Sequence, residues 1–228
     1  MFGHSRLCFW KIIKLISKYL KREPFLEISD DLKIDRKTAS VYGFLCRDRI
    51  IEEVMTNSQR LGGLDEFGIP KVVEIDESLF FRAKYNRGNH TTGQWYVGGV
   101  ERGSKKTFIV PVASRNTATL LQVIRDNVLP GTIVITDEWR AYSSAIRQIT
   151  GIEHRTVNHS LNFVDPNDPD VNTQKVEGFW SLSKREVRSR HGIRQEEHYE
   201  YLLQFIWAHQ LPRDQRMTYL LLLFRINN

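Results

Sequence analysis

The pattern of apolar and polar positions changes character near residue 70. Before that point, apolar residues recur every three or four positions, which is the spacing of an amphipathic helix. This spacing predicts three helices, over residues 9–20, 25–32 and 36–55. Pro24 ends the first helix, and Asp35 is placed to cap the third. Residues 57–70, which contain three glycines, then predict a linker.

The second and third helices have the proportions of a helix-turn-helix. In that arrangement a short helix and a tight turn precede a longer helix, which enters the major groove of DNA. Arg36 and Lys37 begin this longer helix and are candidates for contacting DNA. We therefore expect residues 1–56 to form a helix-turn-helix-like DNA-binding region. A plain three-helix bundle has the same pattern and stays open as the alternative.

Beyond residue 70 the chain alternates short apolar runs with helical segments. The runs at 72–75, 95–100 and 107–112 predict strands, and a turn at 102–105 joins the last two as a hairpin. The later elements are predicted as a helix over 117–129, a strand over 132–136, a helix over 141–149, an edge strand over 154–158 and a helix over 173–190. This order predicts an α/β domain over 71–210. It is the order of a ribonuclease-H-like fold, a mixed five-stranded sheet flanked by helices.

The segment after Glu197 predicts amphipathic helices, with a C-terminal helix over 211–228. These helices either close the core or meet a second subunit. No apolar run approaches the roughly 20 residues that span a bilayer, and lysines interrupt the apolar N-terminal segment, so we expect neither a membrane span nor a signal peptide. Cys8 and Cys46 are too few for a disulfide scaffold or a four-cysteine zinc site. A reducing, intracellular setting is therefore expected.

The composition is that of an ordinary globular protein, with 41% hydrophobic and 26% charged residues, which excludes collagen-like and disordered classes. The formal net charge of +6 is modest for 228 residues. Its distribution is more informative, because residues 175–194 hold six basic residues against two acidic ones. This local excess favours a polyanionic partner, and a solvated helix face explains it equally well.

Three carboxylates lie where a sheet would gather them. Asp76 follows the strand predicted to end at Ile75, and Asp137 follows the strand predicted to end at Thr136. If these strands are neighbours, both side chains emerge at one edge of the sheet, near Glu177 in the first turn of the long helix. Carboxylate oxygens suit Mg²⁺ or Mn²⁺, and two such ions can promote phosphoryl transfer. Any one of these acids could instead cap a helix or a strand end, but the set of three favours a metal site.

Basic residues continue the same helical face. Lys184 lies nearly two turns after Glu177, and Arg188 extends the row, so both are candidates for contacting DNA phosphates. Lys84 and Arg87 lie in a glycine-containing loop after Asp76, which either follows DNA or is simply solvated. Asn158, His159 and His154 are candidates for auxiliary roles near the metal. For the two histidines, a structural role is the favoured interpretation.

The ordered set of motifs over residues 70–210 resembles the DDE transposases of the Merlin superfamily and related bacterial insertion-sequence transposases. The motifs are Glu74–Ser78 (EIDES), Lys84–Gly88 (KYNRG), Trp95–Arg102 (WYVGGVER), Thr136–Tyr142 (TDEWRAY), Val157–Ser160 with Asn162–Pro166, and Asn172–Ser181 followed by Lys184. The resemblance implies a ribonuclease-H-like core and a catalytic triad of Asp76, Asp137 and Glu177. It also implies that the triad binds two Mg²⁺ or Mn²⁺ ions.

The resemblance implies an enzyme that cleaves DNA at transposon ends and transfers the 3′-hydroxyl strand into target DNA. Water and then the 3′-hydroxyl would be the nucleophiles, without a covalent protein intermediate. The implied partners are DNA and a second copy of the chain, in the nucleus of a eukaryotic host or the nucleoid and cytoplasm of a bacterial one. Relatives often begin with a cysteine-rich zinc ribbon, which is missing here. A domesticated or truncated DNA-binding protein without catalysis is therefore one alternative, and a ribonuclease-H-type hydrolase is another; a glycosidase ranks last.

Overall fold

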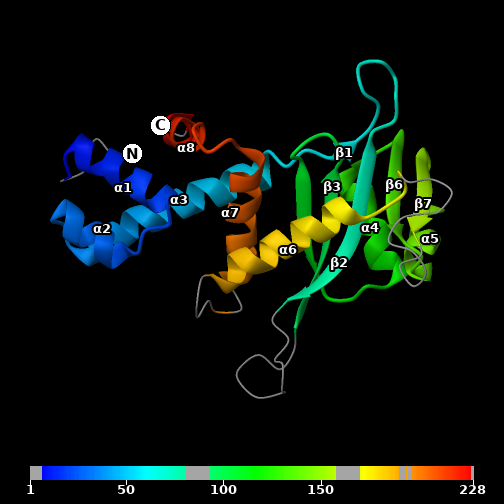
Figure 1. Cartoon of the computed structure of the whole chain (residues 1–228), viewed down its shortest axis with the longest axis horizontal. Coiled ribbons are helices and arrows are strands. Elements are labelled where there is room, and N and C mark those ends of the chain that lie inside the picture. Colours follow the sequence, from blue (N-terminus) through cyan, green and yellow to red (C-terminus); the bar gives the residue numbers. More distant parts are fainter. Residues whose placement is uncertain (1–6, 81–92, 158–169, 190–193, 195–196, 227–228) are drawn as a thin grey trace. The chain divides into compact units, whose positions relative to one another are not determined.

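The computed structural model describes residues 7–80, 93–157, 170–189, 194 and 197–226 (Figure 1). The chain divides into two compact units, a helical unit of residues 1–58 with 206–228 and a sheet unit of residues 59–205. Helix α7 (His198–Gln210) has residues in both. Within the described ranges, no helix combines the length and the apolar character that crossing a membrane requires.

The helical unit contains the three helices expected from the sequence. They are α1 (Phe9–Leu20), α2 (Phe25–Leu32) and α3 (Arg36–Thr56). Lys33 ends α2 in the left-handed conformation with φ of 49°, and the Asp35 carboxylate accepts the backbone N–H of Lys37 at 2.8 Å as the α3 cap. The turn between α2 and α3 therefore has the tight form that the sequence predicts.

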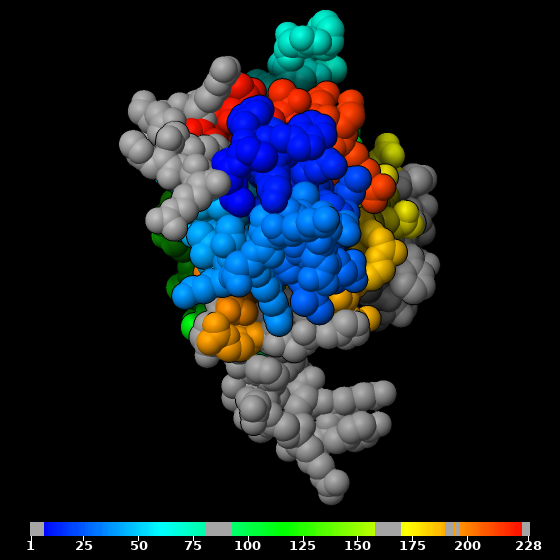
Figure 2. Space-filling model, turned by 90° about the vertical axis from the view of Figure 1, so that its left-hand side faces the viewer, coloured from blue at the N-terminus to red at the C-terminus, as the bar shows by residue number. Residues whose placement is uncertain are grey.

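Helix α8 (Arg216–Ile226) completes the core of this helical unit. Leu220 of α8 is fully buried together with Ile16 of α1 and Cys46 of α3, and the Tyr219 hydroxyl donates to Glu53 of α3 at 2.6 Å. Figure 2 looks onto this unit and shows α1, in dark blue, beside α8 in red. The C-terminal helix α8 therefore closes a core, which was one of the two roles considered for it. This core is the one formed by the N-terminal helices.

The sheet unit is built on five strands in the order β4-β3-β2-β6-β7. The strands are β2 (Val72–Phe80), β3 (Gln94–Glu101), β4 (Thr107–Val112), β6 (Thr132–Asp137) and β7 (Ile152–Val157). The first three form an antiparallel meander, whereas β6 and β7 run parallel to β2. This strand order, with β7 at the edge, confirms the predicted ribonuclease-H-like fold class.

Helices cover both faces of the sheet. On one face, α4 (Thr117–Asn127) and α5 (Arg140–Ile146) bury the inward side chains of β2 and β6, among them Val73, Ile75 and Val134. On the other face, α6 (Gln174–Arg188) packs on β2 and β3. Because side chains alternate along a strand, Glu74 and Asp76 point to the α6 face, while Glu77 points to the α4–α5 face.

Strand β2 is longer than the sequence predicts, so Asp76 lies inside the strand and not directly after it. The parallel pairing with β6 ends at Glu74 and Ile135, but the antiparallel pairing with β3 continues to Phe80 and Gln94. The expectation of an end at Ile75 was wrong because the polar run after it interrupts the apolar pattern without interrupting the hydrogen-bond ladder.

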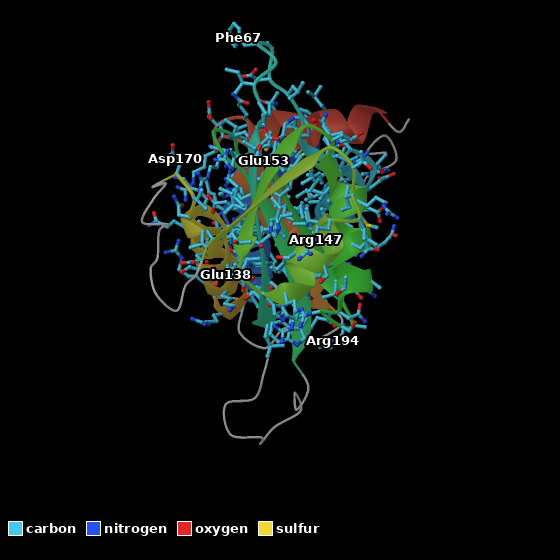
Figure 3. All side chains as sticks on the ribbon, turned by 90° about the vertical axis from the view of Figure 1, so that its right-hand side faces the viewer. Phe67, Glu138, Arg147, Glu153, Asp170 and Arg194 are labelled. Carbon is cyan, nitrogen blue, oxygen red and sulfur yellow. The ribbon has the colours of Figure 1, made fainter. Side chains whose placement is uncertain are left out.

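Residues 57–70, expected as a linker, contribute to the sheet unit from residue 59 onward. Strand β1 (Leu61–Gly62) pairs in parallel with β5 (Val128–Leu129), and Leu61 is buried in the core of α4 and α5. In the turn that follows, Phe67 is highly exposed and projects from the rest of the sheet unit (Figure 3).

Helix α6 approaches the sheet closely at Gly98. A Cβ atom at Gly98 would lie 2.6 Å from Cζ2 of Trp180, whose ring is buried and also contacts Phe80 edge-on at 5.8 Å. Trp180 is therefore a core residue.

We expect Gly98→Ala to destabilise the protein by about 1–3 kcal/mol, because the new methyl group must displace the Trp180 ring. Gly178→Ala is a matched control in α6, since a Cβ there meets no atom within 4 Å. It should stabilise by about 0.5–1 kcal/mol through its higher helix propensity. Urea unfolding measures the stability of both variants. Equal effects of the two substitutions would contradict the close packing of Trp180 against Gly98.

Candidate active site

The sheet register places Asp76 and Asp137 at the same level on neighbouring strands. Glu74 of β2 pairs with Ile135 of β6, and each aspartate lies two residues further along its strand. Residues two apart share a face of the sheet, and paired residues of parallel strands point to the same side. Both aspartates therefore belong to the face that α6 covers, as the sequence argument expected of neighbouring strands.

Glu74 attaches α6 to this face. Its carboxylate is fully buried and accepts the backbone N–H groups of Lys175 and Val176, in the first turn of α6, at 2.8 and 3.0 Å. The other carboxylate oxygen forms an ion pair with Nε of Arg102 at 2.6 Å. The positive end of the helix and the guanidinium together compensate a charge that would otherwise be very costly to bury.

Arg102 extends this attachment to the segment that leads into α6. Its guanidinium donates to the backbone carbonyls of Asp170 and Asn172 at 2.5 and 2.8 Å. Thr173 then precedes the helix, and its hydroxyl donates to the Glu177 carboxylate at 2.9 Å. The exposed Glu177 thus belongs to the same first turn of α6 that Glu74 fixes through Lys175 and Val176.

The environment of Asp76 raises the pKa of its carboxyl group. Burial raises it to about 7, with further contributions from the negative charges of Glu77, Asp137 and Glu177. Mutual electrostatic influence of this kind requires that the acids lie near one another. Asp137 and Glu177, the other acids of the predicted triad, are therefore near enough to act on Asp76 electrostatically.

The donor set fits a hard divalent cation in its chemistry. Asp76, Asp137 and Glu177 offer only carboxylate oxygens, and a cation would relieve the repulsion that raises the pKa of Asp76. Asp137 also accepts the N–H of Trp139 at 3.1 Å, which orients its carboxylate. Among the described residues, no three Asp, Glu, His or Cys side chains already converge as ligands of one ion.

Lys184 lies close to this acidic group. Its ammonium is 5.5 Å from the centre of the Phe80 ring. Burial, and then the charge of Arg188, lowers the pKa of Lys184, while the nearby Asp76 raises it. Arg188 lies one turn further along α6 and is exposed. The two cations extend the α6 face away from the carboxylates, as the seven-residue spacing predicts for Lys184.

A second polar cluster lies on the opposite face of β2, and the sequence argument missed it. Glu77 accepts Nη1 of Arg115 and the hydroxyl of the buried Tyr142, both at 2.8 Å. The Arg115 guanidinium stacks 3.6 Å from the centre of the Trp95 ring and 4.9 Å from that of Trp139. Because Trp139 also donates to Asp137, this cluster supports the position of the second aspartate from behind the sheet.

Several predicted site residues lie elsewhere. Lys84, Arg87, Asn158 and His159 fall outside the described residues. Arg36 and Lys37 are exposed at the start of α3 in the helical unit. The His154 ring lies 2.9 Å from the Thr136 hydroxyl on the neighbouring strand, consistent with a structural histidine. Glu138, which follows Asp137, is exposed; its side chain is labelled in Figure 3.

Removing the charge of Glu74 should loosen α6. We expect Glu74→Gln to destabilise the protein by about 3–5 kcal/mol, because the partly buried Arg102 would keep its charge without a counterion. Urea unfolding measures the loss, and hydrogen exchange at the amides of Lys175 and Val176 should accelerate. Glu153→Gln, which breaks a surface ion pair with Arg155, is the control and should change stability by less than about 1 kcal/mol. Slow exchange at both amides in the Glu74 variant would contradict the anchoring role.

The raised pKa of Asp76 makes the metal-free protein sensitive to pH. The folded state binds the Asp76 proton more tightly than the unfolded state, so stability is greatest below about pH 4 for this group and falls as the pH rises through about 7. In EDTA, Asp76→Asn should remove this fall and be more stable than the wild type at pH 8, by up to about 4 kcal/mol. Urea unfolding between pH 4 and 8 tests this, and parallel stability curves for the two proteins would refute it.

Comparisons with known proteins identify the sheet unit. Residues 71–209 match the family model described as ISXO2-like transposase domain. The chain is 35% identical over 103 residues to an uncharacterized transposase-like protein of Haemophilus influenzae, covering 45% of this chain and 79% of that protein. These matches confirm the resemblance to bacterial insertion-sequence transposases that the motifs indicated.

Two solved viral structures are similar at a lower level. One is the HTLV-2 integrase catalytic core domain in complex with magnesium, with 12% identity and a TM-score of 0.39, over 64% of this chain and 93% of that one. The other is the simian T-cell lymphotropic virus intasome in complex with PP2A regulatory subunit B56 gamma. It has 13% identity and a TM-score of 0.43, over 90% of this chain and 74% of that one. The fold assignment rests on the strand order, and the family assignment on the sequence matches. The chain belongs to the family of ISXO2-like transposase domains.

Proposed function

We propose that this chain is a metal-dependent DNA transposase that cleaves DNA at the ends of its element and joins the freed 3′ ends to target DNA. The observation that carries the proposal is the position of Asp76 and Asp137. Each lies two residues beyond the last β2–β6 pair, Glu74 and Ile135, on the sheet face to which Glu74 attaches the helix of Glu177. In a transposase family member, this arrangement of acids suits phosphoryl transfer.

In this proposal Asp76, Asp137 and Glu177 would hold Mg²⁺ or Mn²⁺, two ions in all. Bound divalent ions activate an attacking hydroxyl and neutralise the charge on a leaving oxygen. The residues around the acids supply orientation. Trp139 fixes the Asp137 carboxylate, and Glu74 with Arg102 fixes the helix that carries Glu177.

Lys184 and Arg188 would contact the phosphates of DNA that enters along α6. Their charges compensate phosphate repulsion next to a group of carboxylates, which alone would repel DNA. The Lys184 ammonium lies over the Phe80 ring, and this cation–π contact limits the directions in which the ammonium can point. In the same proposal the helical unit binds DNA through α3, and two copies of the chain act together on the two ends of the element.

The decisive variant changes one acid without changing its shape. Asp137→Asn should reduce Mn²⁺-dependent nicking and strand transfer at least about a hundredfold, because the amide loses the charge that holds the cation. The assay uses labelled duplexes that carry the ends of the element. Glu138→Gln is the matched control, since this exposed neighbour should leave the activity unchanged.

Each result has a distinct meaning. Undiminished nicking by the Asp137 variant would refute its role as a ligand. If the wild-type chain binds DNA but neither nicks nor joins it, the alternative of a DNA-binding protein without catalysis replaces this proposal. Preferential cleavage of an RNA–DNA hybrid would instead support a ribonuclease-H-type hydrolase.

A further inference from the structure

Helix α3 presents apolar side chains to solvent on the face opposite its core. Its buried residues are Ala39, Gly43, Cys46 and Ile50. Val41 and Phe44 are 48% and 47% exposed, and they share one helical face with the exposed Lys37 because the spacings are four and three residues. We call Lys37, Val41 and Phe44 the outer stripe of α3.

Close packing with α2 keeps this stripe facing outward. A Cβ atom at Gly43 would lie 2.2 Å from Cε1 of Phe25, so the inner face of α3 has no room for larger side chains. The Phe44 ring meets the edge of Phe25 at 6.0 Å, and the Arg47 guanidinium lies 5.0 Å from the centre of the Phe44 ring. These contacts fix the orientation of Phe44 while leaving half of the side chain exposed.

The surroundings of the stripe favour a polyanion over a protein partner. The helical unit, residues 1–58 with 206–228, holds 14 basic and 9 acidic residues, a net charge of +5 (14 − 9). The sheet unit holds 19 and 18, a net charge of +1 (19 − 18). Nearly the whole excess charge of the chain therefore lies in the unit that carries the stripe. Arg36 and Lys37 are exposed at the N-terminal end of α3.

We propose that Val41 and Phe44 read thymine methyl groups in the major groove of DNA. Thymine is the base that presents a methyl group in this groove, and apolar side chains distinguish it there. In a helix-turn-helix, residues near the start of the second helix reach the base edges. Arg36 and Lys37 hold the neighbouring phosphates, and the apolar pair supplies the sequence preference. The inference rests on the proposed function, because it makes the DNA of a transposase the partner.

The test removes the methyl groups without changing base pairing. The full chain, in EDTA so that no cleavage occurs, first selects duplexes from a randomised pool. Fluorescence anisotropy then compares a selected duplex with the same duplex in which deoxyuridine replaces thymidine. We expect the wild type to lose about three- to fourfold in affinity for each methyl group contacted, the effect of exposing one buried methyl.

Variants assign the effect to the stripe. The double variant Val41→Ala with Phe44→Ala should bind both duplexes equally, whereas Met55→Ala, a matched change of an exposed residue at the far end of α3, should keep the wild-type preference. Lys37→Ala should weaken binding to both duplexes alike and reduce the salt dependence. Circular dichroism checks that the variants remain folded.

Three outcomes would overturn the inference. They are equal affinity of the wild type for the two duplexes, a thymine preference that persists in the double variant, and a change in oligomeric state in place of a change in DNA affinity. The last outcome would make the stripe a protein interface. Because binding in EDTA is measured separately from strand cleavage, failure here leaves the catalytic proposal standing, and loss of cleavage alone leaves the thymine preference intact.

Discussion

The buried ion pair between Glu74 and Arg102 determines the arrangement of the candidate site. A carboxylate with no exposed surface must be compensated. Here one oxygen accepts the first N–H groups of α6, and the other pairs with Arg102. That requirement fixes the residue at which the helix meets the sheet. Glu177, in the same turn of α6, is placed as a consequence, so a structural charge determines the position of a candidate metal ligand.

The three acids of β2 show how environment separates structure from chemistry. Glu74 is compensated by Arg102 and a helix terminus, and Glu77 by Arg115 and Tyr142. Asp76 lies between them, and burial, with the negative charges of nearby acids as a smaller contribution, raises the pKa of its carboxyl to about 7. A buried acid in a group of like charges is suited to receive a cation or a proton from outside.

The sequence was sufficient wherever the information is local. The bounds of α1 and α2 follow from helical spacing, a proline and a turn, and the strand order follows from hairpins and crossovers. The end of β2 was misplaced because the pairing that extends it comes from β3, and β1 was missed because two residues carry no periodicity. The anchoring role of Glu74 depends on partners 28 and about 100 residues away. An acid inside an apolar strand, as in Val72–Ile75, was nevertheless a signal that a buried cation had to exist.

The helical unit is assembled from two segments of the chain, one that precedes the sheet unit in sequence and one that follows it. Helices α1 and α3 share their core with Leu220 and Phe224, which the ribosome adds only after all of the sheet unit. During translation, part of the apolar surface of the N-terminal helices therefore stays exposed until α8 is synthesised. Their core closes only when α8 emerges, so a nascent chain acquires its complete helical unit after the candidate catalytic residues have been synthesised.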